Sequence, residues 1–340
     1  MPYKLVMMQR AELAPDRHRP VMLAVAGDSA AGKTTLTRGL VAALGGENIS
    51  SMCVDDYHAY DRLERKGLPF TPLNPACNYM DIMEQHLQLL AMGEPILKPV
   101  YNHHAGTLDR PILFTPTDNV IVEGLLPLHS RMSRACFDLS VYLDPPETLR
   151  RVWKVKRDTG QRGYGEAQVL GELERREPES SMYIRPQRRH ADIVVRFAPI
   201  EERDEHTKGL LSATILLRPT ASHPDLSGIL TEDTREAIHL KLIRDDDGKP
   251  VDALHVHAYA DRQTTRKVEE AIWEDLGIDA DLPGELGIIE GQTRSEPLAV
   301  VQLILLYHLL LGRRADAPRA QEGAELSLSS SSAKTKTLTA

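Results

Sequence analysis

The chain has 340 residues, with 41 Lys and Arg against 49 Asp and Glu, so its formal net charge is −8. This length allows one large or two ordinary domains, and the acidic balance argues against general nucleic-acid binding. Three cysteines predict no disulfide framework and indicate a reducing compartment. Charge soon interrupts the first residues, and the longest apolar run, 298–311, contains Gln302 and His308. We therefore expect neither a secretion signal nor a membrane span, and we expect a cytoplasmic protein.

Residues 27–34 read Gly-Asp-Ser-Ala-Ala-Gly-Lys-Thr, which fits the pattern G-x-x-x-x-G-K-[ST]. The apolar run 21–26 predicts a buried strand before it, and apolar residues at helical spacing predict a helix from Lys33 to the glycines at 45 and 46. A strand, a glycine loop and a helix N-terminus together make an anion site. In this pattern Lys33 reaches the β- and γ-phosphates and Thr34 offers a hydroxyl to Mg²⁺. The alternative is a chance glycine turn before a helix, but all fixed positions of the pattern are present. The predicted nucleotide-binding residues of this loop are Gly27, Asp28, Ser29, Ala30, Ala31, Gly32, Lys33, Thr34 and Thr35.

Short apolar strands and helices alternate through the next part of the chain. The predicted strands are 49–54, 120–122, 139–143 and 193–197, and the predicted helices are 81–92, 147–161 and 166–176. This alternation predicts an α/β fold of the P-loop NTPase type, a mostly parallel sheet flanked by helices. Open sheets of this kind bind ligands beyond the carboxyl ends of their strands. We therefore expect the P-loop, Asp55 and Glu123 to meet at one edge of the sheet.

The pattern changes near residue 209 to a C-terminal α+β extension. Strands are predicted at 210–217, 238–243 and 254–259, with a turn at 245–248, and helices at 266–276 and 298–311. The end of the chain is rich in Ser and Thr, which predicts disorder. The predicted organisation is a loose arm at 1–19, a P-loop core at 20–208, the α+β region at 209–312 and a disordered tail at 313–340.

A P-loop identifies a phosphate site and not a reaction. Transfer of a γ-phosphoryl group to a hydroxyl needs a carboxylate base, Mg²⁺ ligands and cations around the equatorial oxygens. Asp55 is the candidate base and Glu123 the candidate second metal ligand, because each directly follows a predicted strand. The alternatives are a helix cap for Asp55 or Asp56 and a turn residue for Glu123.

Five blocks carry a resemblance to a known family. Residues 54–62, VDDYHAYDR, resemble the D-D-Y-H-x-x-D-R signature of the phosphoribulokinase family. Four further blocks resemble that family in the same order: PVYNH at 99–103, EGLLP at 123–127, KVKRDTGQRGY at 154–164 and IRPQRRHAD at 184–192. The resemblance covers 20–197 well and 210–312 loosely. Uridine kinases share the P-loop, the Asp after the second strand and the Glu-Gly pair, but not the Tyr-x-His and Asp-Arg elements in this form.

The resemblance implies ATP- and Mg²⁺-dependent phosphorylation of the C1 hydroxyl of D-ribulose 5-phosphate to ribulose 1,5-bisphosphate, a Calvin cycle type reaction, by a homodimer. By matching position, the catalytic residues are Asp55 as base, Lys33, Lys154, Arg157 and Asp158. Thr34 and Glu123 are the implied ligands of Mg²⁺. The residues implied to bind the sugar phosphate are His58, Arg62, Tyr101, His103 and Arg157. Arg162 is implied to bind the nucleotide.

Other interpretations stay open. The basic run 150–162 has the composition of a solvated helix face, and isolated histidines are often structural. The glycines around Arg162 predict a mobile flap. The second hypothesis for the function is another small-molecule kinase, which acts on uridine or a different sugar phosphate. A nucleotide-binding regulator without phosphoryl transfer is the third, although such a protein needs no base.

One departure from the family concerns redox control. Light-regulated phosphoribulokinases carry a P-loop cysteine where this chain has Ala31, and its disulfide partner there corresponds to Cys53. We therefore expect no disulfide switch in the P-loop. The alternative for Cys53 is a small buried hydrophobic residue at a strand end.

Overall fold

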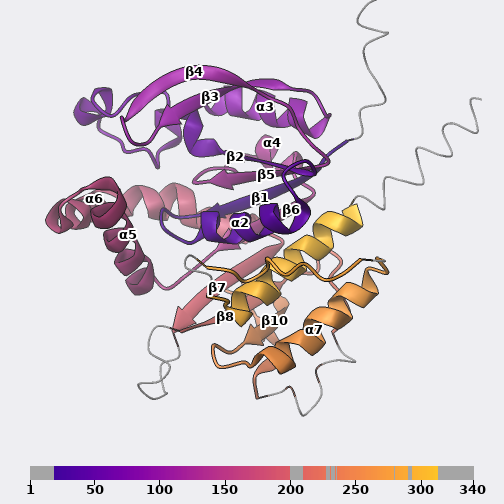
Figure 1. Ribbon diagram of the computed structural model, residues 1–340. Coiled ribbons are helices and arrows are strands. Elements are labelled where there is room, and N and C mark those ends of the chain that lie inside the picture. Colours follow the sequence, from indigo (N-terminus) through magenta and orange to yellow (C-terminus); the bar gives the residue numbers. More distant parts are fainter. Residues whose placement is uncertain are drawn as a thin grey trace, which may run out of the picture.

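The computed structural model describes residues 19–199, 210–226, 230, 234, 236–278, 280–289 and 293–312. An eight-stranded sheet runs through the molecule in the order β2-β5-β1-β6-β7-β8-β10-β9 (Figure 1). Strands β2, β5, β1, β6 and β7 are parallel, whereas β8, β10 and β9 pair antiparallel to their neighbours. Their bounds are β1 Val21–Gly27, β2 Ile49–Cys53, β5 Asn119–Gly124, β6 Leu139–Leu143, β7 Ile193–Pro199, β8 Leu211–Leu217, β9 Ile238–Arg244 and β10 Pro250–Val256.

Helices cover both faces of β1, which explains why all seven of its residues are buried. Side chains of a strand alternate between faces. Leu23 and Val25 accordingly share one apolar cluster with α2 (Lys33–Leu44), α7 (Arg262–Asp275) and the helix at 296–312. Met22 points the other way and joins a cluster with α3 (Met80–Ala91). The predicted α/β fold is confirmed.

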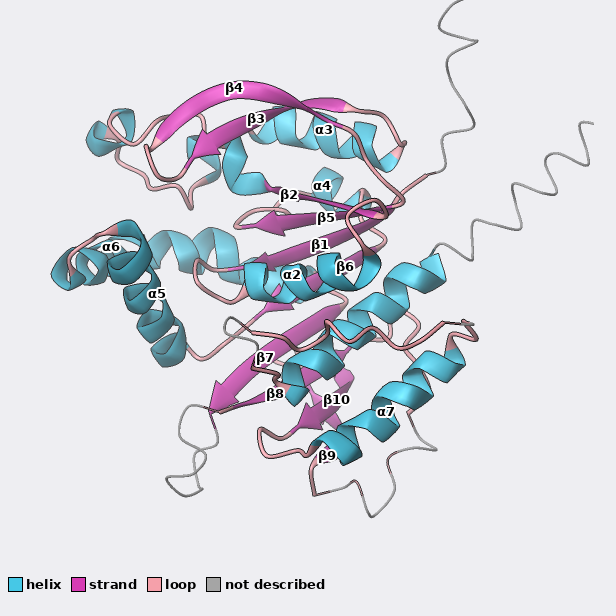
Figure 2. Cartoon of the chain, viewed as in Figure 1, coloured by secondary structure: helices cyan, strands magenta, loops and turns pink. Residues whose placement is uncertain are grey.

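The helices α5 (Glu147–Arg162) and α6 (Glu166–Glu179) project from the sheet as a pair, which we call the lid (Figure 2). The chain returns to β7 through a π-helical turn, η4 (Ser180–Ile184), and a 3₁₀ segment, η5 (Arg185–His190). The pair begins at the carboxyl end of β6, so the lid lies next to the P-loop end of the sheet. A short helix, α4 (Arg131–Ala135), lies between β5 and β6.

A separate antiparallel hairpin was not predicted as strands. It consists of β3 (Ile96–Asn102) and β4 (Thr107–Phe114). β4 is exposed along nearly its whole length, and the register of the pair shifts between Lys98 and Val100. Because of both features, the sequence here lacks the alternation of apolar and polar residues from which a strand is predicted.

The C-terminal elements extend the same sheet. β8 pairs with β7, and the hairpin of β9 and β10 continues from β8. The return strand begins at Pro250 rather than at 254, and α7 begins at Arg262, after the cap in which the Asp261 side chain accepts a hydrogen bond from the Thr264 amide. Residues 1–18 and 313–340 of the predicted arm and tail lie outside the described residues.

Gln302 fastens the helix at 296–312 to α2. Its amide nitrogen donates to the carbonyl of Leu36 at 3.0 Å, and its amide oxygen accepts from the Gly287 amide at 2.7 Å. A Cβ added to Gly39 would lie 2.1 Å from the Gln302 amide nitrogen. The side chain that interrupts the apolar run in the sequence is therefore a fully bonded contact between two helices.

Candidate active site

The P-loop joins β1 to α2 and has the predicted geometry of an anion site. Gly32 has φ of 98° and Ala30 has φ of 66°, left-handed conformations that turn the loop back on itself. The Lys33 amine donates to the carbonyls of Gly27 at 2.8 Å and Asp28 at 3.0 Å. The ammonium charge thus lies within the loop, at the N-terminus of α2, where an anion is favoured.

Oxygen ligands gather beside this loop. The Thr34 hydroxyl donates to Glu123 Oε1 at 3.2 Å, and the Thr37 hydroxyl donates to Oε2 at 3.4 Å. Burial raises the pKa of Glu123, and Lys33 opposes this rise. Such a hydroxyl and carboxylate pair fits Mg²⁺, which binds proteins through few ligands and keeps its remaining positions for water and phosphate. No cluster of three or more His, Cys, Asp or Glu in the described ranges is arranged to hold a metal.

Asp55 and Asp56 follow β2 in the 3₁₀ turn η1 (Val54–Tyr57) and have different surroundings. Asp56 ion-pairs with Lys98 and accepts from the Tyr101 amide at 2.9 Å, so it ties η1 to the β3–β4 hairpin. Asp55 instead accepts from the Leu125 amide at 3.1 Å, just past Glu123. Asp55 therefore lies at the sheet edge predicted from the parallel strands.

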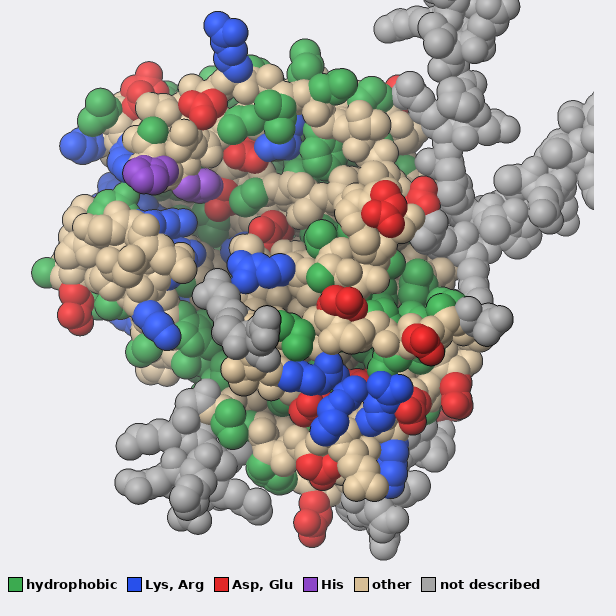
Figure 3. Space-filling model, in the orientation of Figure 1, with side chains coloured by type: hydrophobic (Ala, Val, Ile, Leu, Met, Phe, Trp, Pro, Cys, Tyr) green, Lys and Arg blue, Asp and Glu red, His purple; other side chains and the backbone are tan. Residues whose placement is uncertain are grey.

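The hairpin side of the site contains aromatic and basic side chains that we call the acceptor wall: His58, Arg62, Arg65, Tyr101 and His103. His58 packs edge-on against Tyr101 at a ring-centroid distance of 4.9 Å, and Tyr101 against His103 at 5.0 Å. Arg65 lies over the Tyr101 ring at 4.8 Å and donates to its hydroxyl. Figure 3 shows histidine and cationic side chains along a hollow between the hairpin and the lid.

Arg62 closes the outer part of this wall. Its guanidinium donates to the carbonyl of His103 at 2.6 Å and to that of His104 at 3.3 Å. It also lies 6.0 Å from the ring centroid of Tyr164, at the tip of the lid. The predicted acceptor residues His58, Arg62, Tyr101 and His103 are thus neighbours.

The lid presents its predicted cations around one carboxylate. Asp158 accepts from Lys154 at 2.7 Å and from Arg157 at 2.9 Å, and lies 3.4 Å from Arg162. Burial lowers the pKa of Lys154 to about 8, and the hydrogen bond to Asp158 opposes this shift. Arg157 also donates to the Ser29 hydroxyl at 3.2 Å, which connects the cluster to the P-loop.

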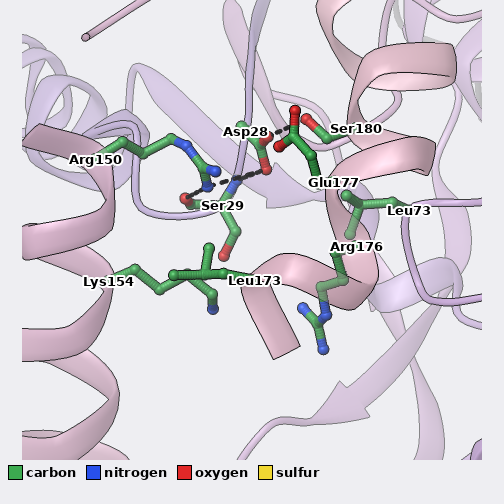
Figure 4. A pocket seen from close by; sticks show the side chains of 9 residues that line it. All are labelled: Asp28, Ser29, Leu73, Arg150, Lys154, Leu173, Arg176, Glu177 and Ser180. Atoms are coloured by element: carbon green, nitrogen blue, oxygen red, sulfur yellow. Dashed lines mark hydrogen bonds and ion pairs between the residues drawn. The ribbon is translucent and has the colours of Figure 1, made fainter. Parts of the chain in front are cut away.

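Figure 4 shows a small pocket where the lid helices meet the P-loop. The Asp28 carboxylate accepts from the Ser180 hydroxyl and lies 3.4 Å from Arg150. Arg150 also donates to the Ser29 carbonyl at 2.9 Å and is paired with Glu147. The Asp28 side chain thus connects the P-loop to α5 through Arg150 and to η4 through Ser180. The carbonyl of Thr35 accepts from Gln302 at 3.3 Å.

Sequence reasoning missed Arg65 and Arg150. Within the described residues, Arg65 Nη1 is buried without a hydrogen-bond partner, and its position after a family signature was the only available pointer. Arg150 could have been found by spacing, because Arg150, Lys154 and Asp158 lie four apart and form the buried face of α5. The alternative interpretation of this run as a solvated helix face therefore does not hold for these three residues.

Comparison with known proteins agrees with this geometry. A family profile described as "Phosphoribulokinase / Uridine kinase family" matches residues 22–203, more than half of the chain. This chain belongs to the phosphoribulokinase/uridine kinase family. The family match includes the P-loop, the acceptor wall and the lid.

Individual relatives come from both branches of the family. Phosphoribulokinase of Synechocystis sp. is 37% identical over 198 residues, 58% of this chain and 60% of that protein. The chloroplastic enzyme of Spinacia oleracea is 33% identical over 202 residues, 54% and 50% of the two chains. Uridine kinase of Lactiplantibacillus plantarum is 30% identical over 190 residues, 54% of this chain and 90% of that protein. The chain thus matches between half and three-fifths of these two phosphoribulokinases.

Among solved structures, phosphoribulokinase from Rhodobacter spheroides superposes with a TM-score of 0.53 at 16% identity, covering 76% of this chain and 99% of that one. At this identity the likeness supports the shared fold alone. In the described part of this family member, no helix is both long and apolar enough to cross a bilayer.

Proposed function

We propose that this protein transfers the γ-phosphoryl group of ATP to the C1 hydroxyl of D-ribulose 5-phosphate. The observation that carries the proposal is the position of Asp55 between the two halves of the site. On the nucleotide side, burial and then the charge of Asp55 raise the pKa of Glu123. On the acceptor side, burial lowers the pKa of His103, and the charge of Asp55 opposes this shift. The contacts of Asp55 agree with this position, because it accepts from the Leu125 amide at 3.1 Å just past Glu123 and lies three residues before His58, which packs against Tyr101 of the acceptor wall.

Asp55 accepts the proton of the attacking hydroxyl in this proposal. The hydroxyl oxygen forms a bond to the γ-phosphorus, the bond from that phosphorus to the bridging oxygen breaks, and ADP leaves. In this proposal Lys33, Lys154 and Arg157 balance the charge of the equatorial oxygens. Mg²⁺, held by Thr34 and Glu123, would supply further neutralisation of the phosphate charge when bound.

Two features support a sugar phosphate as acceptor. The acceptor wall carries Arg65, whose Nη1 is buried and, among the described residues, lacks a hydrogen-bond partner. A guanidinium in such a place gains most from an anion, since charge-assisted hydrogen bonds to phosphate are roughly twice as strong as neutral ones. Arg62 and His103 lie in the same wall. A nucleoside has no phosphate for these groups.

A second candidate is a kinase for uridine or a different sugar phosphate. It is favoured by the uridine kinase match, which covers 90% of that relative.

We also keep the homodimer as a prediction from the family resemblance. A regulator without catalysis has less support, because the site combines a base, metal-type ligands and lid cations.

An assay of ADP release with a panel of acceptors tests the proposal. We expect ribulose 5-phosphate to give a kcat/KM at least about tenfold above those of uridine, ribose 5-phosphate and fructose 6-phosphate. Against uridine, that factor corresponds to the loss of one charge-assisted phosphate contact of about 1.4 kcal/mol. Ribose 5-phosphate and fructose 6-phosphate keep the phosphate, so the preference over them tests where the site holds the reacting hydroxyl. A preference for uridine, ribose 5-phosphate or fructose 6-phosphate would assign the second candidate, and ATP binding without turnover on any acceptor would assign the regulator.

A further inference from the structure

His58, in the acceptor wall, is 4% exposed, and its ring makes one hydrogen bond to another side chain among the described residues, that of Asn78. Its Nδ1 lies 2.6 Å from Asn78 Oδ1. The two residues also face each other in a backbone bridge, and the Tyr79 amide donates to the Tyr57 carbonyl at 2.8 Å. Asn78 is therefore held against His58 by the backbone as well as by its side chain.

The orientation of the Asn78 amide follows from its other contacts. Its nitrogen, Nδ2, donates to the carbonyl of Pro72 at 3.1 Å and to that of Asn74 at 2.8 Å. Carbonyl oxygens only accept, so the side of the amide that faces them must be the nitrogen. The oxygen consequently faces His58, and an oxygen without a hydrogen can only accept. His58 Nδ1 must carry the hydrogen of this bond.

A neutral imidazole with hydrogen on Nδ1 has a bare lone pair on Nε2. The charged groups that act on His58 are Asp55, Arg65 and His103, and the Tyr101 ring packs against it. Burial lowers the pKa of His58 to about 4, with Asp55 opposing the shift. His58 is then neutral near pH 7, and Nε2 is a hydrogen-bond acceptor.

We propose that Asn78 is a positioning residue that fixes His58 as the acceptor for a sugar hydroxyl. The proposal rests on the proposed function for the identity of the acceptor substrate. A lone pair repels a phosphate oxygen and receives a hydroxyl hydrogen, so His58 selects a hydroxyl-bearing part of the substrate. The phosphate of the same molecule is left to the guanidinium groups of Arg62 and Arg65. This assignment differs from a cationic histidine that binds the phosphate.

Nitrogen-15 NMR of the histidine rings tests the first step without any turnover. The His58 signals are identified by their loss in a His58→Gln variant. We expect a protonated, pyrrole-type Nδ1 and an unprotonated, pyridine-type Nε2 at pH 7 in the wild-type protein. Hydrogen on Nε2, or a doubly protonated ring at that pH, overturns the proposal. This measurement decides the tautomer even if the protein phosphorylates an acceptor other than a sugar phosphate.

An Asn78→Asp variant tests the consequence for substrate. The carboxylate keeps the shape of the amide but favours an imidazolium, which turns Nε2 into a donor. We expect KM for ribulose 5-phosphate to rise about tenfold at pH 7, as for the loss of one hydrogen bond, and to recover as the pH is raised. KM for ATP should stay within about twofold of wild type.

Asn48→Asp is the matched control, because Asn48 Nδ2 donates to the Leu44 carbonyl at 2.9 Å at the opposite end of the sheet. It should leave both KM values and the pH profile unchanged. If Asn78→Asp shows the wild-type pH profile and KM, Asn78 does not position His58 for substrate. If Asn78→Asp fails to fold, Asn78→Ser replaces it, with KM for the sugar phosphate raised and the His58 tautomers mixed as the expected result. A wild-type KM and a single tautomer in Asn78→Ser would overturn the proposal.

Discussion

Residues 19–199 and 210–312 differ in where their polar side chains lie. In the first part, carboxylates and cations converge at the carboxyl edge of the parallel strands, as with Asp55, Glu123 and Lys154. In the second part, β8 to β10 extend the sheet, and α7 and the helix at 296–312 bury apolar residues against α2. The same sheet therefore carries the proposed site at one edge and buries apolar residues along one face. This contrast indicates that the second part supports the site without supplying any of its proposed residues.

The largest expected effect comes from Asp55→Asn in the first part. Removing the proton acceptor should lower kcat by about 10²–10⁴-fold, while ATP still binds. Steady-state kinetics and ATP titration measure the two quantities. Asp247→Asn in the exposed turn between β9 and β10 is the control and should keep wild-type kcat. Near-wild-type turnover of Asp55→Asn would rule Asp55 out as the base.

Arg62→Ala and Arg65→Ala should raise KM for ribulose 5-phosphate by about 10- to 150-fold. This range corresponds to a lost charge-assisted contact of about 1.5–3 kcal/mol. KM for ATP should change far less, and Arg244→Ala on β9 should change neither value. A rise confined to the ATP KM would move the affected arginine to the nucleotide side.

Gly39→Ala tests whether the second part is needed for stability. In an open helix this change would stabilise by about 1 kcal/mol. Here the new Cβ would lie 2.1 Å from the Gln302 amide, and overpacking costs about 1–3 kcal/mol. We expect a net loss in urea unfolding, whereas Gly171→Ala, with open space around it, should not destabilise. A gain in stability for Gly39→Ala would show that Gln302 moves aside easily.

Stability should depend on pH through His308, which lies in the second part. Its Nε2 is 3.1 Å from His223 Nδ1. Burial, and then His223, lower the pKa of His308 to about 4 from an ordinary value of 6.5. The unfolded chain binds the proton more readily, so this stability is present above about pH 6.5 and is lost as the pH falls towards 4. His308→Gln should flatten the stability curve in this window, and an unchanged slope would contradict the assignment.

The smallest expected effect is that of oxidation. Cys53, Cys77 and Cys136 are all free thiols in the structure. Burial, followed by the charges of Asp55 and Glu123, raises the pKa of Cys53, which disfavours the reactive thiolate. Treatment with oxidised dithiothreitol should therefore leave activity nearly unchanged. A reversible loss of activity that Cys53→Ser abolishes would show that Cys53 forms a disulfide with another thiol.

The P-loop and the sheet edge could be predicted because their signals are local. A glycine pattern between a strand and a helix specifies backbone geometry within eight residues, and the carboxyl ends of parallel strands place Asp55 and Glu123 together. The β3–β4 hairpin could not be predicted in the same way. Its exposed second strand and its register shift remove the alternation, so only the family block at 99–103 pointed to Tyr101 and His103.

Contacts between distant segments were beyond sequence reasoning. Nothing in the spacing of Asn78 and His58, or of Gln302 and Gly39, indicates that they touch, because the contact depends on how separate elements pack. The roles of Asp55, His58 and the lid cations in catalysis remain predictions, and so do the domain boundaries.

A competition experiment tests the central claim most directly. The protein is mixed with ATP, Mg²⁺ and equal concentrations of ribulose 5-phosphate and uridine, and the products are followed by phosphorus-31 NMR. The proposal predicts that the new phosphate ester is that of ribulose 1,5-bisphosphate, formed in step with ADP, with little uridine monophosphate. Uridine monophosphate as the main product, or ADP formed equally well without either acceptor, would contradict it.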